Sequence, residues 1–146
     1  MDIEKLIEFN GKKNEFMIYN GIRIKSAKKD CVEVSLQIGP HSLNTYGLLH
    51  GGAYYTMADC AAGAAAKSDG GHYVTLSGGL NYIKSVSEGT VTAKGSVIHR
   101  GRTTCILHVD ITDEKDALLA EGDFTMFCIE QPQTEEEAKT GTDTVD

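Results

Sequence analysis

The sequence predicts an α+β fold in which one antiparallel sheet wraps around a single long helix. Three observations support this class. Residues 50–68 are rich in alanine, the strongest helix former. Several other segments alternate apolar and polar residues with the period of a half-buried strand. The last of these segments follow one another through short turns, which favours antiparallel pairing within one sheet.

The first expected element is a short amphipathic helix over residues 2–9. Ile3, Leu6 and Ile7 have helical spacing there, and Asn10-Gly11 is expected to end the helix. Two strands should follow, joined by a hairpin turn at residues 28–30. The first begins at Ile22. Strict alternation defines the second, whose apolar positions are Val32, Val34, Leu36 and Ile38.

The alanine-rich segment 50–68 is the expected long helix. No proline and no β-branched run interrupts it. At 1.5 Å per residue it would be about 27 Å long. Apolar positions lie on nearly all of its sides, which is typical of a helix enclosed by the protein. Asp69-Gly70-Gly71 should end it.

The second half of the chain predicts further strands. Gly78-Gly79 interrupts the first of these, which indicates a bulge or a close backbone approach. Arg100-Gly101 is the expected turn between two others. The expected strand segments are residues 72–85, 90–99, 102–112 and 117–129.

The net charge of −7 belongs mostly to the end of the chain. Residues 130–146 carry six acidic residues and one lysine, a net charge of −5, so the preceding 129 residues account for only −2. This tail lacks periodic apolar positions and is expected to be disordered, which leaves 1–129 as a single domain. An acidic chain without a basic stripe is a poor candidate for binding duplex nucleic acid.

The sequence also indicates the cellular compartment in which the protein is expected. No run approaches the ~18 apolar residues of a membrane-spanning helix, and the N-terminus lacks the apolar stretch of a signal peptide. The four cysteines, Cys31, Cys60, Cys105 and Cys128, have no CxxC spacing. We therefore expect a cytoplasmic protein with reduced thiols, no membrane association and no metal site. The histidines outside the motif below, including His108, are expected to be structural or solvated.

The segment His50-Gly51-Gly52 stands where a loop enters the long helix. Free backbone N–H groups at a helix N-terminus, beside glycines that admit a ligand, can bind an oxyanion or a carbonyl oxygen. The alternative is that these glycines only permit a tight turn and close packing.

Asp59 lies in the middle of the same helix, where an unpaired buried carboxylate is costly. It is either a nucleophile or general base in a partly dry site, or a structural residue bonded to a neighbouring hydroxyl. Cys60 is a poor candidate nucleophile, because adjacent helical positions point about 100° apart and Cys60 should not share the site of Asp59.

Spacing adds a constraint on assembly. Gly51 and Asp59 are eight residues apart, or about 12 Å along one helix. A catalytic carboxylate and an oxyanion donor must both lie about 3 Å from the reacting group. One helix cannot supply both, but two antiparallel helices related by a two-fold axis can. If both groups act together, the active site is shared between the chains of a homodimer.

These residues carry a resemblance to a known family. Asn44, Gly47, His50, Gly51, Gly52 and Asp59 reproduce the N-x-x-G-x-x-H-G-G-(x6)-D pattern of hotdog-fold acyl-CoA thioesterases of the PaaI-like, phenylacetyl-CoA thioesterase type. The similarity covers roughly residues 15–129. The hotdog fold, a long helix wrapped by an antiparallel sheet, agrees with the layout expected above.

The resemblance implies a role for each matched residue. The Gly51 N–H would donate to the thioester oxygen, with His50 shaping that site. Asn44 would hydrogen-bond the thioester or the attacking water. Asp59 of the partner chain would attack the carbonyl or activate water. A hydroxyl on the following strand would orient that water; Thr75 is the first choice and Ser77 the alternative.

The resemblance also suggests substrate-binding residues. Arg100, Arg102 and Lys84 resemble basic positions near the coenzyme A phosphates, although arginines at a hairpin are often simply solvated. Gly52 is assigned to substrate binding beside Gly51, and Ser77 is also included. Three residues of the long helix either line an acyl pocket or belong to the core: Tyr54, Tyr55 and Met57.

The function expected first is hydrolysis of an acyl-CoA thioester to a carboxylic acid and free coenzyme A, without a cofactor. Thioesters are already activated, so an oxyanion donor and a carboxylate are sufficient. The alternative is a non-catalytic acyl-CoA or small-ligand binding protein in which Asp59 is structural. Hydratase or dehydratase chemistry ranks last. Pairs of dimers associate in this family, so the expected assembly is a homotetramer.

Overall fold

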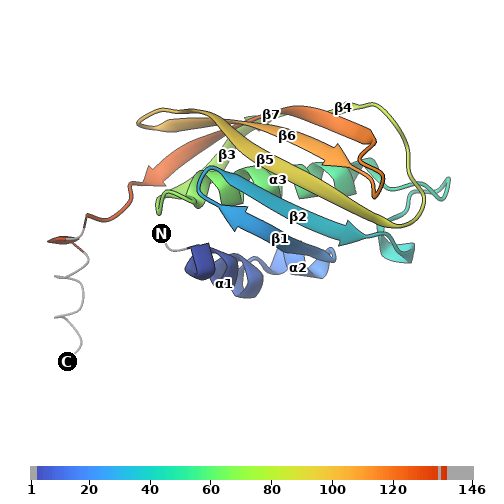
Figure 1. Cartoon of the computed structure of the whole chain (residues 1–146), viewed down its shortest axis with the longest axis horizontal. Helices are drawn as coiled ribbons and strands as arrows, with labels where there is room; N and C mark the ends of the chain where they lie inside the picture. The colour runs from blue at the N-terminus through green and yellow to red at the C-terminus, as the bar shows by residue number, and fades with distance from the viewer. Residues whose placement is uncertain (1–2, 135, 138–146) are drawn as a thin grey trace.

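The computed structural model describes residues 3–134 and 136–137. Its order of elements is helix, short helix, two strands, a 3-10 turn, long helix and five strands (Figure 1). The prediction of an acidic disordered tail falls largely on residues 135 and 138–146, which lie outside the described residues. The helices are α1 (Ile3–Lys13), α2 (Glu15–Tyr19), the 3-10 turn η1 (Pro40–Ser42) and α3 (Gly51–Lys67).

One antiparallel sheet contains every strand. Its order is β1-β2-β5-β6-β7-β3, with the short β4 pairing with β7. The strand that follows the long helix, β3, therefore lies at the far edge, beside the last strand of the chain. The bounds are β1 (Ile22–Lys28), β2 (Cys31–Gln37), β3 (His72–Gly78), β4 (Asn81–Tyr82), β5 (Thr90–Arg100), β6 (Thr104–Thr112) and β7 (Leu118–Glu130).

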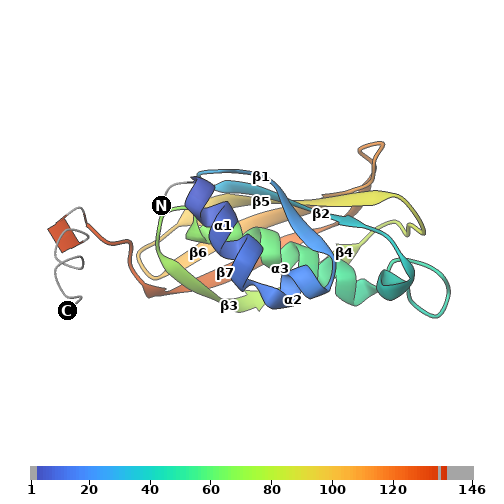
Figure 2. The same ribbon diagram turned by 90° about the horizontal axis from the view of Figure 1, so that it is seen from below.

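The sheet curls around α3 (Figure 1). α3 packs mainly against β5, β2 and β6, and most of its alanines are fully buried, as the apolar composition on all sides predicted. On the open side of α3, α1 and α2 pack against both α3 and β1 (Figure 2). The predicted hotdog architecture, one long helix wrapped by an antiparallel sheet, is confirmed.

Alternation predicted the strands well because each has one buried face. Along β6 every second residue is buried, from Cys105 to Ile111. The predicted hairpin turn is present, with Asp30 at φ 67° between β1 and β2. The segment predicted over 72–85 is split into β3 and β4, because Gly78-Gly79 ends the first strand. The predicted close approach there is confirmed: a side chain on Gly78 would collide with the ring of Phe124.

The N-terminal prediction was partly wrong. α1 continues through Asn10-Gly11 to Lys13, where basic residues favour its C-terminal end. A glycine weakens a helix interior by about 1 kcal/mol, which packing of α1 against β1 can offset. α2 was not expected. Its N-cap is Asn14, whose side chain accepts a hydrogen bond from the Met17 N–H at 3.2 Å.

Candidate active site

Asp59 and Thr75 meet where the middle of α3 faces the edge strand β3. The Thr75 hydroxyl donates a hydrogen bond to Asp59 Oδ1 at 2.6 Å. Ser77 lies further along β3, past an irregularity in the β3–β7 register, and is exposed. Of the two candidate hydroxyls, the structure therefore brings Thr75 to the carboxylate.

A hollow of about 510 Å³ opens over this pair. Its floor is one stripe of α3, its walls are β3 and α2, and its lining is mostly apolar. On α3 the lining positions repeat every three or four residues, as one face of a helix requires. The residues are Asn14, Phe16, Tyr55, Thr56, Asp59, Cys60, Gly63, Ala64, Lys67, Tyr73, Val74, Thr75 and Met126.

Of the three helix residues proposed for an acyl pocket, one lines this hollow. Tyr55 does, with its ring 5.3 Å from that of Phe124, centroid to centroid. Tyr54 and Met57 are buried core residues instead. Tyr54 packs edge-to-face against Tyr82 and donates a hydrogen bond to the Lys84 carbonyl at 3.2 Å.

Two titratable groups share the hollow with Asp59. Cys60 lines it too, so the expectation that adjacent helical positions cannot share one site was wrong, because the hollow is wide enough to include both. Burial raises the pKa of the Cys60 thiol to about 12, with the charge of Asp59 adding to the effect, so the thiol stays protonated at neutral pH. Burial lowers the pKa of Lys67, against the opposing effects of Cys60 and Asp59.

The second half of the predicted site lies at the start of α3. The His50 side chain caps the helix: its Nδ1 accepts a hydrogen bond from the Gly52 N–H at 2.8 Å. An accepting Nδ1 carries no proton, so this geometry fits neutral His50. Across the described residues, no hydrogen bond occupies the Gly51 N–H. That N–H is one of the helix donors left for a ligand.

The loop before α3 is closed by Asn44. Its Oδ1 accepts hydrogen bonds from the N–H groups of Tyr46 (2.8 Å) and Leu48 (3.0 Å), and Gly47 adopts φ 74° within the turn. This network positions Asn44 beside Gly51. Both line a small hollow of about 220 Å³ whose other residues are Leu48, Leu49, Tyr54, Tyr82, Ile83, Lys84 and Ser85.

Tyr82 belongs to this half of the site, although the sequence analysis did not include it. Its hydroxyl donates to the Gly51 carbonyl at 2.7 Å. The side chain is about half exposed, so it forms a wall beside the helix N-terminus. Lys84 lines the same hollow and is exposed. Lys84, which the resemblance groups with Arg100 and Arg102, therefore lies near Asn44 and Gly51.

Arg100 has protein partners on the other side of the molecule. Its guanidinium pairs with Asp30 and Asp69, both at 2.8 Å, and donates to the carbonyls of Ala65 and Ala66 at the end of α3. This geometry gives Arg100 a structural role. Its phosphate contact stays a prediction, as does that of exposed Arg102.

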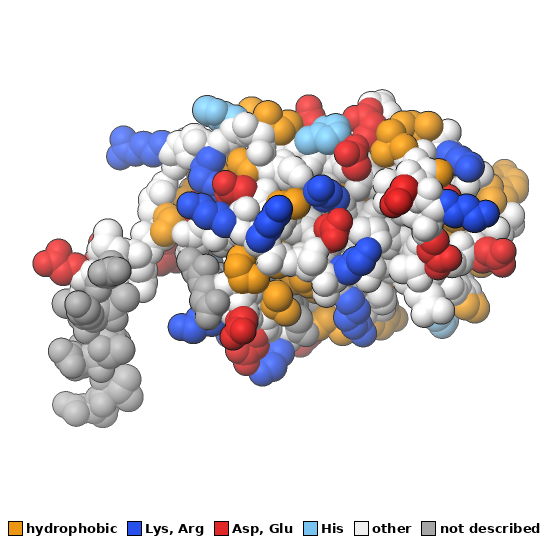
Figure 3. Space-filling model, viewed as in Figure 1, with side chains coloured by type: hydrophobic (Ala, Val, Ile, Leu, Met, Phe, Trp, Pro, Cys, Tyr) orange, Lys and Arg blue, Asp and Glu red, His pale blue; other side chains and the backbone are white. Residues whose placement is uncertain are grey.

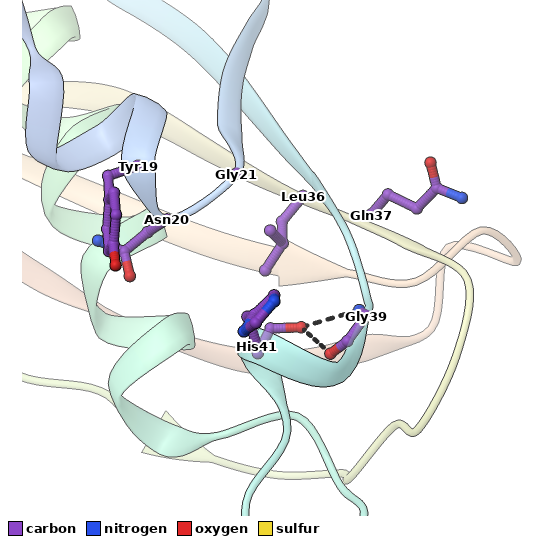
Figure 4. Close-up of a pocket in the computed structure, with 8 residues that line it drawn as sticks. Tyr19, Asn20, Gly21, Leu36, Gln37, Gly39 and His41 are labelled. Carbon is purple, nitrogen blue, oxygen red and sulfur yellow. Dashed lines mark hydrogen bonds between the residues drawn. The ribbon is translucent and has the colours of Figure 1, made fainter.

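A further hollow of about 500 Å³ lies between the end of α2 and the 3-10 turn (Figure 4). Tyr19 and Asn20 form one side, and Leu36, Gly39 and His41 lie across from them. A smaller hollow shares Asn20, His41 and Ser42 with it and reaches His50 and Gly52. The smaller hollow therefore reaches the N-terminus of α3, and neither Asp59 nor Thr75 lines either hollow.

Charge on the outer face does not single out a partner. Acidic and basic side chains are interspersed over the face seen in Figure 3, which differs from the basic stripe of a nucleic-acid-binding surface. Within the described ranges, no helix is long and apolar enough to cross a membrane. Among the same residues, no group of three or more His, Cys, Asp or Glu side chains is placed to hold a metal ion.

Comparison with known proteins agrees with this fold and motif. A family model described as the thioesterase superfamily matches residues 46–120, just over half of the chain. The putative esterase ComA2 of Bacillus subtilis is 34% identical over 112 residues, which cover 74% of this chain and 88% of that protein. A 1,4-dihydroxy-2-naphthoyl-CoA hydrolase of Listeria monocytogenes is 35% identical over 102 residues, covering 68% and 83%.

Solved structures share this fold over most of the chain. A hypothetical thioesterase of Streptococcus pneumoniae, solved with coenzyme A, superposes with a TM-score of 0.79 at 32% identity, covering 85% of this chain and 99% of that one. The E. coli PaaI protein matches with a TM-score of 0.81 over 91% and 100% of the two chains, and at 21% identity it shows the fold alone. The chain belongs to the thioesterase superfamily. It is a hydrolase of the hotdog fold.

Proposed function

We propose that this protein hydrolyses an acyl-CoA thioester to a carboxylic acid and free coenzyme A. The observation that supports this most is the Asp59–Thr75 pair, with a hydrogen bond of 2.6 Å, facing a largely apolar hollow. The carboxylate attacks the thioester carbonyl carbon or accepts the proton of a water molecule that does so, while Thr75 fixes its orientation. The carbon–sulfur bond then breaks, and the coenzyme A thiolate leaves and takes up a proton. Where the carboxylate itself is the nucleophile, this step leaves an acyl–Asp59 anhydride, which a water molecule hydrolyses to the free acid and the regenerated carboxylate.

The oxyanion formed in this reaction needs a donor, which we assign to the Gly51 N–H. Gly51 and Asp59 lie on one continuous helix, α3, with about 12 Å between them. We therefore propose an isologous homodimer in which Gly51, His50 and Asn44 of one chain face Asp59 and Thr75 of the other. Each dimer then has two equivalent sites.

The edge strand supports this assembly. β3 ends the sheet, and its Val74 and Leu76 side chains are 49% and 61% exposed. An exposed apolar edge strand is a template for pairing with another chain. Pairing along β3 would also bring the two α3 helices alongside one another. We propose that two such dimers form a tetramer, in the cytoplasm, where thiols such as the four free cysteines stay reduced.

The solved relatives support the same pair of residues. The Streptococcus pneumoniae thioesterase was also solved as two variants, with an aspartate or a threonine replaced by alanine. Those two residues are 16 positions apart in that chain, and so are Asp59 and Thr75 here. In this protein Lys84, beside Gly51, and Arg102 are the cations we assign to coenzyme A phosphates.

The test is release of free thiol from a panel of acyl-CoA thioesters by the wild type and by Asp59→Asn. Asparagine keeps the size of the side chain but removes the carboxylate, so we expect kcat to fall by about a thousandfold or more. Circular dichroism checks that the variant folds. A wild type that binds coenzyme A in calorimetry yet releases thiol from no thioester would instead be the non-catalytic binding protein.

A further inference from the structure

The hollow over Asp59 has an unusual charge arrangement at its far end. Lys67 lines it, eight residues beyond Asp59 on the same face of α3 and therefore about 12 Å along the helix axis. Among the described residues that line this hollow, Lys67 is the one cation and Asp59 the one carboxylate. The floor between them is formed by Cys60, Gly63 and Ala64.

Among the described residues, no hydrogen-bond or ion-pair partner of the Lys67 ammonium group explains this position. Within the part of the chain that the structure describes, its ammonium group has no ion pair and no side-chain hydrogen bond. A lysine in the last turn favours the helix dipole, but an exposed lysine would do so equally well. A partly buried ammonium group facing apolar walls is costly unless a ligand supplies an acceptor.

The number of charges indicates which part of the substrate enters this hollow. Coenzyme A carries several phosphate charges, which a single lysine would leave largely unpaired. An acyl group that extends from the thioester carbonyl at Asp59 carries no phosphate, and apolar walls suit its carbon chain. One ammonium group at the end of such a hollow matches one negative charge at the end of the acyl chain.

We propose that the acyl group of the substrate carries a carboxylate at its far end, which Lys67 binds. This inference rests on the proposed thioesterase function and names its substrate class: the coenzyme A monothioester of a dicarboxylic acid. The reaction itself is unchanged, since only the thioester end is hydrolysed. Phe16 and Tyr73 form the walls that pack against the intervening carbon chain.

The test compares suberyl-CoA with octanoyl-CoA, which share chain length and differ in a terminal carboxylate or methyl group. We expect the wild type to prefer suberyl-CoA in kcat/KM by about tenfold or more, because a carboxylate that pairs with a partly buried ammonium is strongly favoured over a methyl group. Lys67→Met should reduce this ratio to about one or below. Lys67→Arg, which keeps the charge, should retain a preference for suberyl-CoA.

Lys115→Met is the matched control, because Lys115 is exposed in the turn between β6 and β7 and its removal should leave the ratio unchanged. Succinyl-, adipyl- and sebacyl-CoA vary the distance between the thioester and the terminal carboxylate. The kcat/KM of these dicarboxylic thioesters should be highest at the chain length that lets the carboxylate reach Lys67.

A wild type that hydrolyses suberyl-CoA and octanoyl-CoA with a kcat/KM ratio near one, or a ratio that is unchanged in Lys67→Met, overturns this proposal and leaves the thioesterase function standing. Absence of hydrolysis with every thioester overturns that function itself. If Lys67→Met does not fold, Lys67→Gln takes its place.

Discussion

The hydroxyl of Thr75 donates to Asp59 Oδ1 at 2.6 Å, joining the edge strand β3 to the middle of α3. This bond fixes one carboxylate oxygen, so the orientation of the other is set as well. Preorganisation of this kind lowers the barrier because the reacting group need not be reoriented during the reaction.

We expect Thr75→Val to lower kcat by about tenfold to a hundredfold, since valine keeps the shape but removes the hydroxyl. Thr75 is exposed, so unfolding in urea should change little. Thr75→Ser keeps the hydroxyl and should retain most of the activity. Steady-state thiol release measures all three proteins. Equal kcat for the valine variant and the wild type would show that the hydrogen bond has no part in catalysis.

Local patterns predicted the half of the site that depends on spacing within α3. The positions of Gly51 and Asp59 follow from one uninterrupted helix, which alanine content and the absence of proline indicate. The strands were predictable because a sheet with one buried face forces alternation. By contrast, α2 has five residues, too few for a periodic pattern, so the wall that Phe16 contributes was missed.

Long-range placement is what the sequence could not provide. Pairing of β3 with β7 joins segments about 50 residues apart, and no local pattern indicates it. Lys67 lies in the same helical stripe as Asp59 and Gly63, a spacing that is visible in the sequence, but only the fold places that stripe against β3. The Arg100-Gly101 sequence looks like an ordinary solvated hairpin turn. Only the folded structure shows that the Arg100 side chain pairs with Asp69.

Replacing Arg100 tests whether its ion pairs stabilise the fold. Its side chain is 22% exposed, and that of Asp69 is 13% exposed. Removing one member of a partly buried ion pair leaves the other charge without compensation, so we expect Arg100→Met to lower the free energy of unfolding by about 2–3 kcal/mol. Urea unfolding at fixed protein concentration measures this, because an oligomer's stability depends on concentration.

The matched control is Arg102→Met. That side chain is exposed, and its loss should change stability by less than about 0.5 kcal/mol. Removing a phosphate contact would have a different effect, raising KM for acyl-CoA without affecting unfolding. We expect that pattern for Arg102→Met and the loss of stability for Arg100→Met. The reverse assignment would contradict the structure.

His108 makes stability depend on pH. It lies between Asp123 and Asp110, with ring-nitrogen-to-carboxylate distances of 2.7 and 3.0 Å. The Asp123 hydrogen bond is the main cause that raises the pKa of His108 above its ordinary value of 6.5, against desolvation. A raised folded-state pKa contributes stability that is fully present below the unfolded value and is lost as pH rises through the folded value.

We therefore expect His108→Gln to lower the urea midpoint more at about pH 6 than at about pH 9, because only the lower pH charges the wild-type imidazole. His99 offers a control, since it is an exposed histidine on the neighbouring strand β5, and His99→Gln should show no such difference. A midpoint difference that is the same at both pH values would exclude a charged His108 in the folded protein.

Subunit complementation tests the shared active site. Gly51→Pro removes the N–H assigned to the oxyanion. The proline should be tolerated: Gly51 is the first residue of α3, where proline is favoured, and His50 before it already has φ −63° and ψ 136°, as a residue preceding proline requires. A side chain there would meet the Tyr82 ring at an ordinary 3.7 Å.

Gly51→Pro and Asp59→Ala homodimers should each be nearly inactive, because every site in them lacks one group. A mixed dimer has one site without both groups and one intact site. Mixing the two variants under exchange conditions should therefore restore activity toward half of the wild-type value per mixed dimer. Mixing Asp59→Ala with Thr75→Val is the control, since both lesions belong to the same half of the site and no intact site can form. Recovery in the control equal to that of the test pair, or a hydrolytically active species that sediments as a monomer, would mean that Gly51 and Asp59 do not act across a dimer interface.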